Sequence, residues 1–297
     1  MGVKREMSGF HLRTVSISGL SGQIVTAAER YVRPLAWACL VVNVMIVVTG
    51  GLVRLTGSGL GCPTWPQCQP GTGSVWPQHG ANGYHTAIEF GNRMVTPLIT
   101  IVVGATLVAI WRMAQRRYAL WLLAGVALQA IIGGITVRIK LNPWLVSAHL
   151  MISMVMIAAA VALVVSLYRQ LPTPDLLGWA QFAAAFVALT LGTVVSGAGP
   201  HAGDEHVKRN GLSPLQSAQV HTDAVMLLTG LTIAIVVLRR SHAAYALLAA
   251  VVINAIIGFV QYFTHLPIGL VAAHMLGASL VAAASTWVLL ERRNSLA

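Results

Sequence analysis

The chain has 297 residues, of which 56% are hydrophobic and only 9% are charged. In soluble globular proteins about a quarter of the residues are charged, so this composition excludes an ordinary soluble protein. The formal net charge of +11 would suit a nucleic-acid-binding protein. The basic residues are instead placed around apolar segments, so we interpret the charge as a membrane-topology signal and expect no nucleic-acid partner.

Apolar segments of about twenty residues, long enough to cross the hydrocarbon core as helices, recur along the chain. They predict an all-α fold, a polytopic membrane protein that lies in the lipid bilayer. We expect eight transmembrane helices, at residues 34–54, 86–111, 118–137, 144–167, 178–197, 216–238, 243–262 and 269–290.

Basic residues are distributed unequally between the two sides that these eight spans define. Thirteen are assigned to the inner side: Lys4, Arg5, Arg13, Arg30, Arg33, Arg112, Arg116, Arg117, Arg169, Arg239, Arg240, Arg292 and Arg293. Six are assigned to the outer side or to the spans: Arg54, Arg93, Arg138, Lys140, Lys208 and Arg209. This bias predicts a multi-pass protein of the cell membrane with both termini in the cytoplasm. The polar N-terminal region lacks a signal-peptide core, so the first span is expected to be an uncleaved anchor.

The sequence contains an internal repeat. Residues 130–149 and 255–274 are identical at nine of twenty aligned positions, and both stretches end in a histidine. Four spans in each half would enter the membrane in the same orientation, which predicts two pseudo-symmetric four-helix bundles. The expected organisation is a cytoplasmic N-terminal segment at 1–33, an N-terminal bundle at 34–170, a cytoplasmic linker at 171–177 and a C-terminal bundle at 178–297. Proline after residues 142 and 266 predicts hairpin turns before the fourth and eighth spans.

Ionisable side chains within the spans are candidates for function, because burying them in a membrane is costly. The second span carries His85, Glu89, Asn92 and Arg93. Residues 85, 89 and 92 share one helix face, and Glu89 and Arg93 are spaced to form an ion pair. The alternative is an ordinary ion pair at the solvated outer end of this helix.

Three further histidines, His149, His221 and His274, lie in the fourth, sixth and eighth spans. A four-helix bundle commonly builds a cofactor site from side chains on facing helices. Opposed imidazoles such as those of His221 and His274 are what six-coordinate haem iron requires. Zinc is less favoured, because a tetrahedral site needs more ligands nearby. A proton relay from the same residues is an open alternative.

The first half has His149 on its fourth helix, but its second helix offers only His85 or Asn92 as a partner. Asparagine is a poor haem ligand, so this half is expected either to hold five-coordinate iron or to use His85. Glu89 lies beside this open position. The asymmetry predicts one closed, electron-handling site and one open, reactive site.

Cys62 and Cys68 flank five residues in the loop after the first span. The outer side is oxidising, so we predict a disulfide between them. A metal site that includes His79 and His85, or a redox-active pair, are the alternatives. Cys39 lies within the first span and is expected to be an inert core residue.

These motifs resemble those of the heme A synthase family, and the resemblance extends over essentially all eight spans. The elements that carry it are Gly50-Gly51-Leu52-Val53-Arg54-Leu55-Thr56-Gly57-Ser58-Gly59-Leu60-Gly61-Cys62, then Trp65-Pro66-Gln67-Cys68, Ile88-Glu89-Phe90 with Arg93, and Asn142-Pro143-Trp144-Leu145-Val146 before His149. The actinobacterial branch of the family is expected to be nearest.

The resemblance implies an enzyme that oxidises a methyl group of heme O to the formyl group of heme A. It implies that His221 and His274 ligate a resident heme b, and that His149 is an axial ligand of the substrate site. Glu89 would be the essential carboxylate, and Cys62 with Cys68 the outer-loop pair. Dioxygen, water or both would supply the oxygen.

The chain departs from the family pattern at two places. The family commonly has Glu-x-x-His-Arg in the second span, whereas this chain has Asn92 before Arg93. Many members carry a second cysteine pair in the outer loop of the second half, and residues 198–215 contain no cysteine. The first departure leaves His85, Asn92 or water as the second ligand of the substrate.

The expected partners are the lipid bilayer, the heme O synthase (protoheme farnesyltransferase), an electron donor, an aa3-type oxidase under assembly, and a second copy of the chain. Arg54, Arg93, Arg138 or Lys140 would pair with haem propionates. Two alternative functions remain: a quinol-linked membrane cytochrome b, and a haem carrier without porphyrin chemistry.

Overall fold

A computed structural model describes residues 30–71, 74–77 and 83–291. Lys4, Arg5, Arg13, His79, Arg292 and Arg293 lie outside the described residues, as does most of the expected N-terminal segment. The described part consists of eight helices and no strand: α2 (Val32–Leu55), α3 (Gly83–Ala109), α4 (Arg116–Arg138), α5 (Pro143–Ser166), α6 (Leu176–Ala198), α7 (Pro214–Arg239), α8 (His242–Phe263) and α9 (Ile268–Leu289). The predicted all-α fold is confirmed, and every predicted span end lies within three residues of the observed helix end.

All eight helices are long and apolar enough to cross a membrane. Their outward faces carry large exposed apolar side chains, such as Ile101, Trp121 and Phe263. In water such a surface would aggregate, whereas lipid tails solvate it. The protein is therefore a multi-pass membrane protein.

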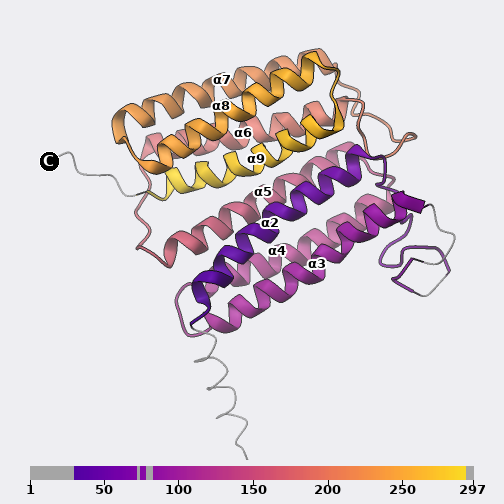
Figure 1. The fold of residues 1–297 in the computed structure, drawn as a ribbon, viewed down its shortest axis with the longest axis horizontal. Helices are drawn as coiled ribbons and strands as arrows, with labels where there is room; N and C mark the ends of the chain where they lie inside the picture. The colour runs from indigo at the N-terminus through magenta and orange to yellow at the C-terminus, as the bar shows by residue number, and fades with distance from the viewer. Residues whose placement is uncertain (1–29, 72–73, 78–82, 292–297) are drawn as a thin grey trace, which may run out of the picture.

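The helices form two groups of four (Figure 1). Helices α2 to α5 contact one another in one group, and α6 to α9 in the other. The groups meet where α9 contacts α2 and α5, and where α5 contacts α6. The connections α2–α3, α4–α5, α6–α7 and α8–α9 lie at one end of the molecule. We call this the long-loop end, because it carries the two longest connections, α2–α3 and α6–α7.

Several helices begin at residues whose side chains satisfy free backbone N–H groups. At α5, the Asn142 side chain accepts hydrogen bonds from the N–H groups of Trp144 and Leu145, and Pro143 occupies the first turn. At α7, Ser213 caps in the same way ahead of Pro214. These local signals place the starts of α5 and α7, and therefore the height of every residue along these helices.

The internal repeat extends to the backbone of two turns. Lys140 and Leu141, before α5, have φ values of 55° and 58°, while His265 and Leu266, before α9, have values of 63° and 60°. In each turn the second residue donates its N–H to the carbonyl five residues earlier, at 2.8 and 2.7 Å. The two predicted hairpin turns are confirmed, and they give α5 and α9 equivalent starting points.

Close helix packing in the second half depends on a glycine. A Cβ built at Gly277, on α9, would lie 2.1 Å from Oδ1 and 3.1 Å from Cβ of Asn254, on α8. Gly230, on α7, has no neighbour within 4 Å of such a Cβ. The two glycines therefore form a matched pair for testing the packing of α8 against α9.

We expect Gly277→Ala to destabilise the protein by about 1–3 kcal/mol, because the added methyl group overpacks the α8–α9 contact. Thermal unfolding in detergent would measure the effect, with Gly230→Ala as the control that is unchanged or slightly stabilised. Asn254→Ala in the Gly277→Ala background should restore part of the loss. Equal unfolding temperatures for the two glycine variants would contradict this packing.

Candidate functional site

Four helices that begin at the long-loop end each place an ionisable residue at nearly the same height. Glu89 on α3, His149 on α5 and His274 on α9 lie six residues after the first residue of their helix, and His221 on α7 lies seven residues after. At 1.5 Å per residue, this is about 10 Å along each helix. The candidate residues of both halves therefore lie at one depth below the long-loop end.

The imidazoles of His221 and His274 lie close together in the second half. Their ring centroids are 6.5 Å apart and their planes are nearly perpendicular, at 88°. Nδ1 of His221 donates to the carbonyl of Ala188 at 3.0 Å, and Nδ1 of His274 donates to the carbonyl of Asn254 at 3.1 Å. A carbonyl only accepts hydrogen bonds, so both bonds fix the proton on Nδ1 and leave Nε2 as the basic nitrogen.

A glycine lies beside each of these two imidazoles. A Cβ built at Gly192 would lie 3.1 Å from Cε1 of His221, and one at Gly258 would lie 3.0 Å from Cε1 of His274. Each glycine follows the carbonyl acceptor by four residues, so both lie on one face of α6 or α8. Each ring thus makes one hydrogen bond to a neighbouring helix and packs against the backbone of a glycine on that helix.

The separation of these two rings is compatible with a metal that both imidazoles would hold between them. Two metal–imidazole bonds of about 2 Å each would separate the two nitrogens by about 4 Å, and the ring centroids lie farther apart than the nitrogens. In the described residues, no group of three or more His, Cys, Asp or Glu side chains could hold a metal ion. A haem would need only these two protein ligands, because the porphyrin supplies the remaining four.

His149 occupies the equivalent position in the first half but is held differently. A Cβ built at Gly133 would lie 3.3 Å from its Cε1, as the repeat predicts. Its Nδ1 is buried and has no hydrogen-bond partner. Gln129, at the position of Asn254 in the repeat, donates its side-chain amide to the His149 carbonyl at 2.9 Å and to Ser153. The His149 imidazole therefore has the glycine of the repeat without the anchoring bond.

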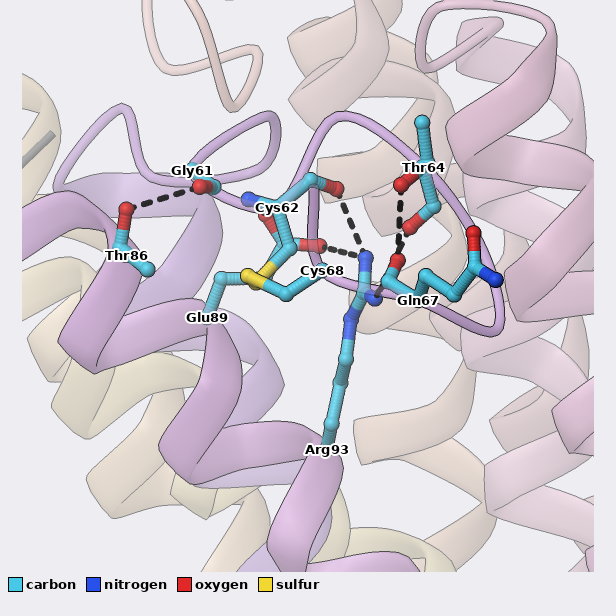
Figure 2. A network of polar contacts seen from close by, with 8 residues as sticks. All are labelled: Gly61, Cys62, Thr64, Gln67, Cys68, Thr86, Glu89 and Arg93. Atoms are coloured by element: carbon cyan, nitrogen blue, oxygen red, sulfur yellow. Dashed lines mark hydrogen bonds and ion pairs between the residues drawn. A yellow bond between two sulfur atoms is a disulfide. The ribbon is translucent and has the colours of Figure 1, made fainter. Parts of the chain in front are cut away.

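Glu89 is buried against the loop that follows α2, and Figure 2 shows its surroundings. Only 4% of the residue is exposed. Oε2 accepts the N–H of Cys62 at 2.6 Å, and Oε1 accepts Nη2 of Arg93 at 2.6 Å. Cys62 and Cys68 form a disulfide. The predicted ion pair and the predicted disulfide are both confirmed, and the two features form one network.

Arg93 connects helix α3 to both ends of the disulfide-closed ring, residues 62–68 (Figure 2). Nη2 donates to the Cys62 carbonyl at 2.8 Å, and Nη1 donates to the carbonyls of Thr64 at 2.9 Å and Gln67 at 3.3 Å. A loop carbonyl buried without water needs such a donor. The polar face of α3 therefore holds the ring in place.

The same ring reaches α4 through Trp65. A Cβ built at Gly134 would lie 2.6 Å from Cδ2 of the indole, so Trp65 packs directly on the α4 backbone. The preceding residue, Gly133, is the one on which His149 lies. The loop consequently contacts Glu89 at one side and the helix surface beside His149 at the other.

The two candidate partners of His149 have other contacts. Nδ1 of His85 lies 3.0 Å from the hydroxyl of Ser58, and Oδ1 of Asn92 accepts the hydroxyl of Thr49 at 2.7 Å. The structure places no hydrogen bond or ring contact between His149 and either residue. The second axial ligand in this half therefore stays a prediction. Cys39 is free and buried, as expected, beside the hydroxyl of Thr106.

Two features of the site were absent from the sequence interpretation. One is the set of glycines at 133, 192 and 258, and the other is the bond from the Cys62 N–H to Glu89. The repeat contained a signal for two of the glycines, because residues 133 and 258 are equivalent positions four residues after an amide side chain. Nothing in the sequence indicated the N–H bond.

The fold and the site together define a multi-pass membrane protein with one anchored histidine pair and one unanchored histidine. The cytochrome oxidase assembly protein family (COX15-CtaA) matches residues 33–224, which is more than half of the chain. The chain belongs to this family, and the resemblance seen in the sequence is confirmed.

Curated relatives give the same result. The heme A synthase of Lysinibacillus sphaericus (strain C3-41) is 32% identical over 141 residues, 46% of this chain and 44% of the relative. That of Bacillus pumilus (strain SAFR-032) is 28% identical over 43% of this chain and 42% of the relative. That of Rhizorhabdus wittichii is 25% identical over 82% of this chain and 88% of the relative. The chain thus spans less than half the length of the first two relatives and most of the third.

We expect Arg93→Leu to release the ring 62–68 from α3 and leave the Glu89 carboxylate buried without its cation. Removing one partner of a buried pair costs about 3–5 kcal/mol. Hydrogen exchange of the ring and thermal unfolding would both report the loss. Arg138→Leu is the control, since this exposed arginine makes one bond to the ring, to the Trp65 carbonyl at 3.2 Å. Equal protection of the ring in both variants would contradict the role of Arg93.

Proposed function

We propose that this chain is a heme A synthase, which oxidises a methyl group of heme O to the formyl group of heme A. The observation that carries the proposal is the difference between the halves. One half has two anchored, neighbouring imidazoles, and the other has an unanchored imidazole near a loop that binds a buried carboxylate. Membership of the family and the names of the relatives support it.

In this proposal His221 and His274 hold a resident heme b in the C-terminal bundle. A haem with two histidine ligands supplies single-electron transfer. The bonds from Nδ1 to the carbonyls of Ala188 and Asn254 orient the rings and increase the basicity of Nε2. Gly192 and Gly258 leave room for the rings against α6 and α8.

The N-terminal bundle would bind heme O as substrate, with His149 as an axial ligand. A substrate must enter and leave, and a ligand without an anchoring bond suits exchange better than a fixed one. Its buried Nδ1 still needs a hydrogen-bond acceptor, which water or a small shift toward α4 would provide. His85, Asn92 or water would complete the coordination.

Glu89 is the proposed catalytic residue. A methyl C–H bond is not acidic, so a base alone cannot oxidise it, and dioxygen, water or both must supply the oxygen. A carboxylate has about four acceptor sites. The bonds to Cys62 and Arg93 use two of them, and the Gly61 backbone also interacts with the carboxylate. The remaining capacity would hold a water or accept a proton beside the reacting methyl group.

The proposed orientation places the long-loop end outside the cell and both termini in the cytoplasm. The disulfide at this end agrees with an oxidising compartment. The proposed partners are the heme O synthase that supplies the substrate, an electron donor, and an aa3-type oxidase that receives the product. A homo-oligomer is also proposed.

The test is mass spectrometry of haems extracted from cells that make heme O, with and without the chain. We expect heme A only with the chain, and none with Glu89→Ala, although heme b stays bound to that variant. Glu205→Ala, which removes an exposed loop carboxylate, should leave the yield unchanged. Normal heme A yield with Glu89→Ala would contradict the catalytic role. Bound heme b without any heme A from the wild type would favour a cytochrome or a carrier.

A second prediction concerns the glycine beside His274. Gly258→Ala should displace the imidazole, because the new Cβ would lie 3.0 Å from its Cε1. We expect loss of at least half of the bound heme b, measured by the absorbance of the purified protein. Gly269→Ala is the control on α9, since its Cβ would have no neighbour within 4 Å. Unchanged haem content in Gly258→Ala would show that haem binding does not require the close contact between Gly258 and His274.

A further inference from the structure

At the long-loop end, two arginines from different parts of the chain bind the same turn. Arg54, in the last turn of α2, donates from Nε to the carbonyl of His201 at 2.7 Å and from Nη2 to the carbonyl of Ser196 at 2.5 Å. Arg209, in the α6–α7 connection, donates from Nη2 to the carbonyl of Pro200 at 2.5 Å. A residue of the first half and a residue of the second half thus bind the same turn, residues 196–201.

Neither guanidinium has a counter-ion in the part of the chain that the structure describes. By contrast, the partly buried Arg93 and Arg239 each have a carboxylate oxygen 2.6 Å away. No carboxylate lies within ion-pair distance of Arg54 or Arg209 in the described ranges, and their two charges repel each other. Arg54 is partly buried, and Arg209 is an exposed like charge beside it. A partly buried charge with a like charge as its neighbour and no counter-ion is destabilising, so this arrangement favours a bound anion.

The turn covers the end of the second half. Nε2 of His201 donates to the carbonyl of Leu266, in the α8–α9 turn, at 3.0 Å. The Gly59 N–H donates to the carbonyl of Gly203 at 2.7 Å, which joins the long loops of the two halves. The two arginines therefore lie at the end of the bundle whose helices α7 and α9 carry the histidine pair.

The guanidinium groups have free capacity for a ligand. Each has five N–H donors, and the hydrogen bonds within the described chain use two of them in Arg54 and one in Arg209. The forked geometry of these donors matches a carboxylate. A porphyrin carries carboxylate groups, which are costly in hydrocarbon and are therefore expected at a membrane surface.

We propose that Arg54 and Arg209 bind the carboxylate groups of the haem held by His221 and His274. This rests on the proposed function. Four cations were expected from the sequence to pair with haem propionates, and their positions in the structure favour one of them, Arg54. Arg93 is neutralised by Glu89, whereas Arg138 and Lys140 are exposed at the end of α4, in the first half. Arg54 therefore remains a candidate for binding the haem carboxylates, and Arg209 is added as a second.

The test is a spectroscopic titration of the full-length apoprotein, made in haem-deficient cells and kept in neutral detergent. The probes are haem and its dimethyl ester, which lacks the carboxylate charges. We expect the wild type to bind haem more tightly than the ester. Arg209→Gln should reduce this preference by about threefold to fivefold, the range for an exposed charge pair. Arg54→Gln should reduce it by about tenfold or more, because this guanidinium is partly buried.

Matched variants distinguish the specific effect of Arg209 from the effect of the net charge of its loop. Lys208→Gln removes the neighbouring exposed cation and should keep the wild-type preference, and Arg209→Lys should keep most of it. Equal preferences in wild type and Arg209→Gln, with haem still bound, would overturn this inference alone. The same result with loss of co-purified anionic lipid would overturn it in favour of a lipid headgroup. A wild type that binds neither porphyrin would overturn the proposed haem site as well.

Discussion

A polar side chain buried in a membrane must find its partner within the protein, and this constraint organises the long-loop end of the molecule. Glu89 meets it through the Cys62 N–H and Arg93, and Arg93 in turn satisfies three loop carbonyls. The loop that closes the first half is therefore built from the same bonds that neutralise its carboxylate. Losing one member would leave the others buried without partners, so the network acts as a unit.

The repeat makes the two halves similar, and small differences in hydrogen bonding make them unequal. His149 and His274 lie at equivalent positions on equivalent glycines. Among the described residues, His274 has a carbonyl for its Nδ1 and a second histidine ring near its own, whereas His149 has neither. The first half has Asn92, bound to Thr49, at the position where the family commonly has histidine. Under the proposed function, the duplicated scaffold would provide one fixed haem site and one adaptable substrate site.

The sequence predicted the features that depend on residues close together in the chain. Helix spans follow from hydropathy, the Glu89–Arg93 pair from its spacing of four, and the Cys62–Cys68 disulfide from a short loop on an oxidising side. Long-range contacts were out of reach. The carbonyls that anchor His221 and His274 belong to residues 33 and 20 positions earlier in the chain, on other helices. The Trp65–Gly134 contact and the convergence of Arg54 and Arg209 likewise depend on how the helices pack, which no local pattern encodes.

We propose that the two halves have different roles, with a fixed haem in the second half and an exchangeable substrate in the first. Electron paramagnetic resonance of the purified protein tests it most directly. A haem fixed by His221 and His274 should give a low-spin signal that His149→Ala retains and His274→Ala loses. Loss of the signal in His149→Ala with retention in His274→Ala would contradict it.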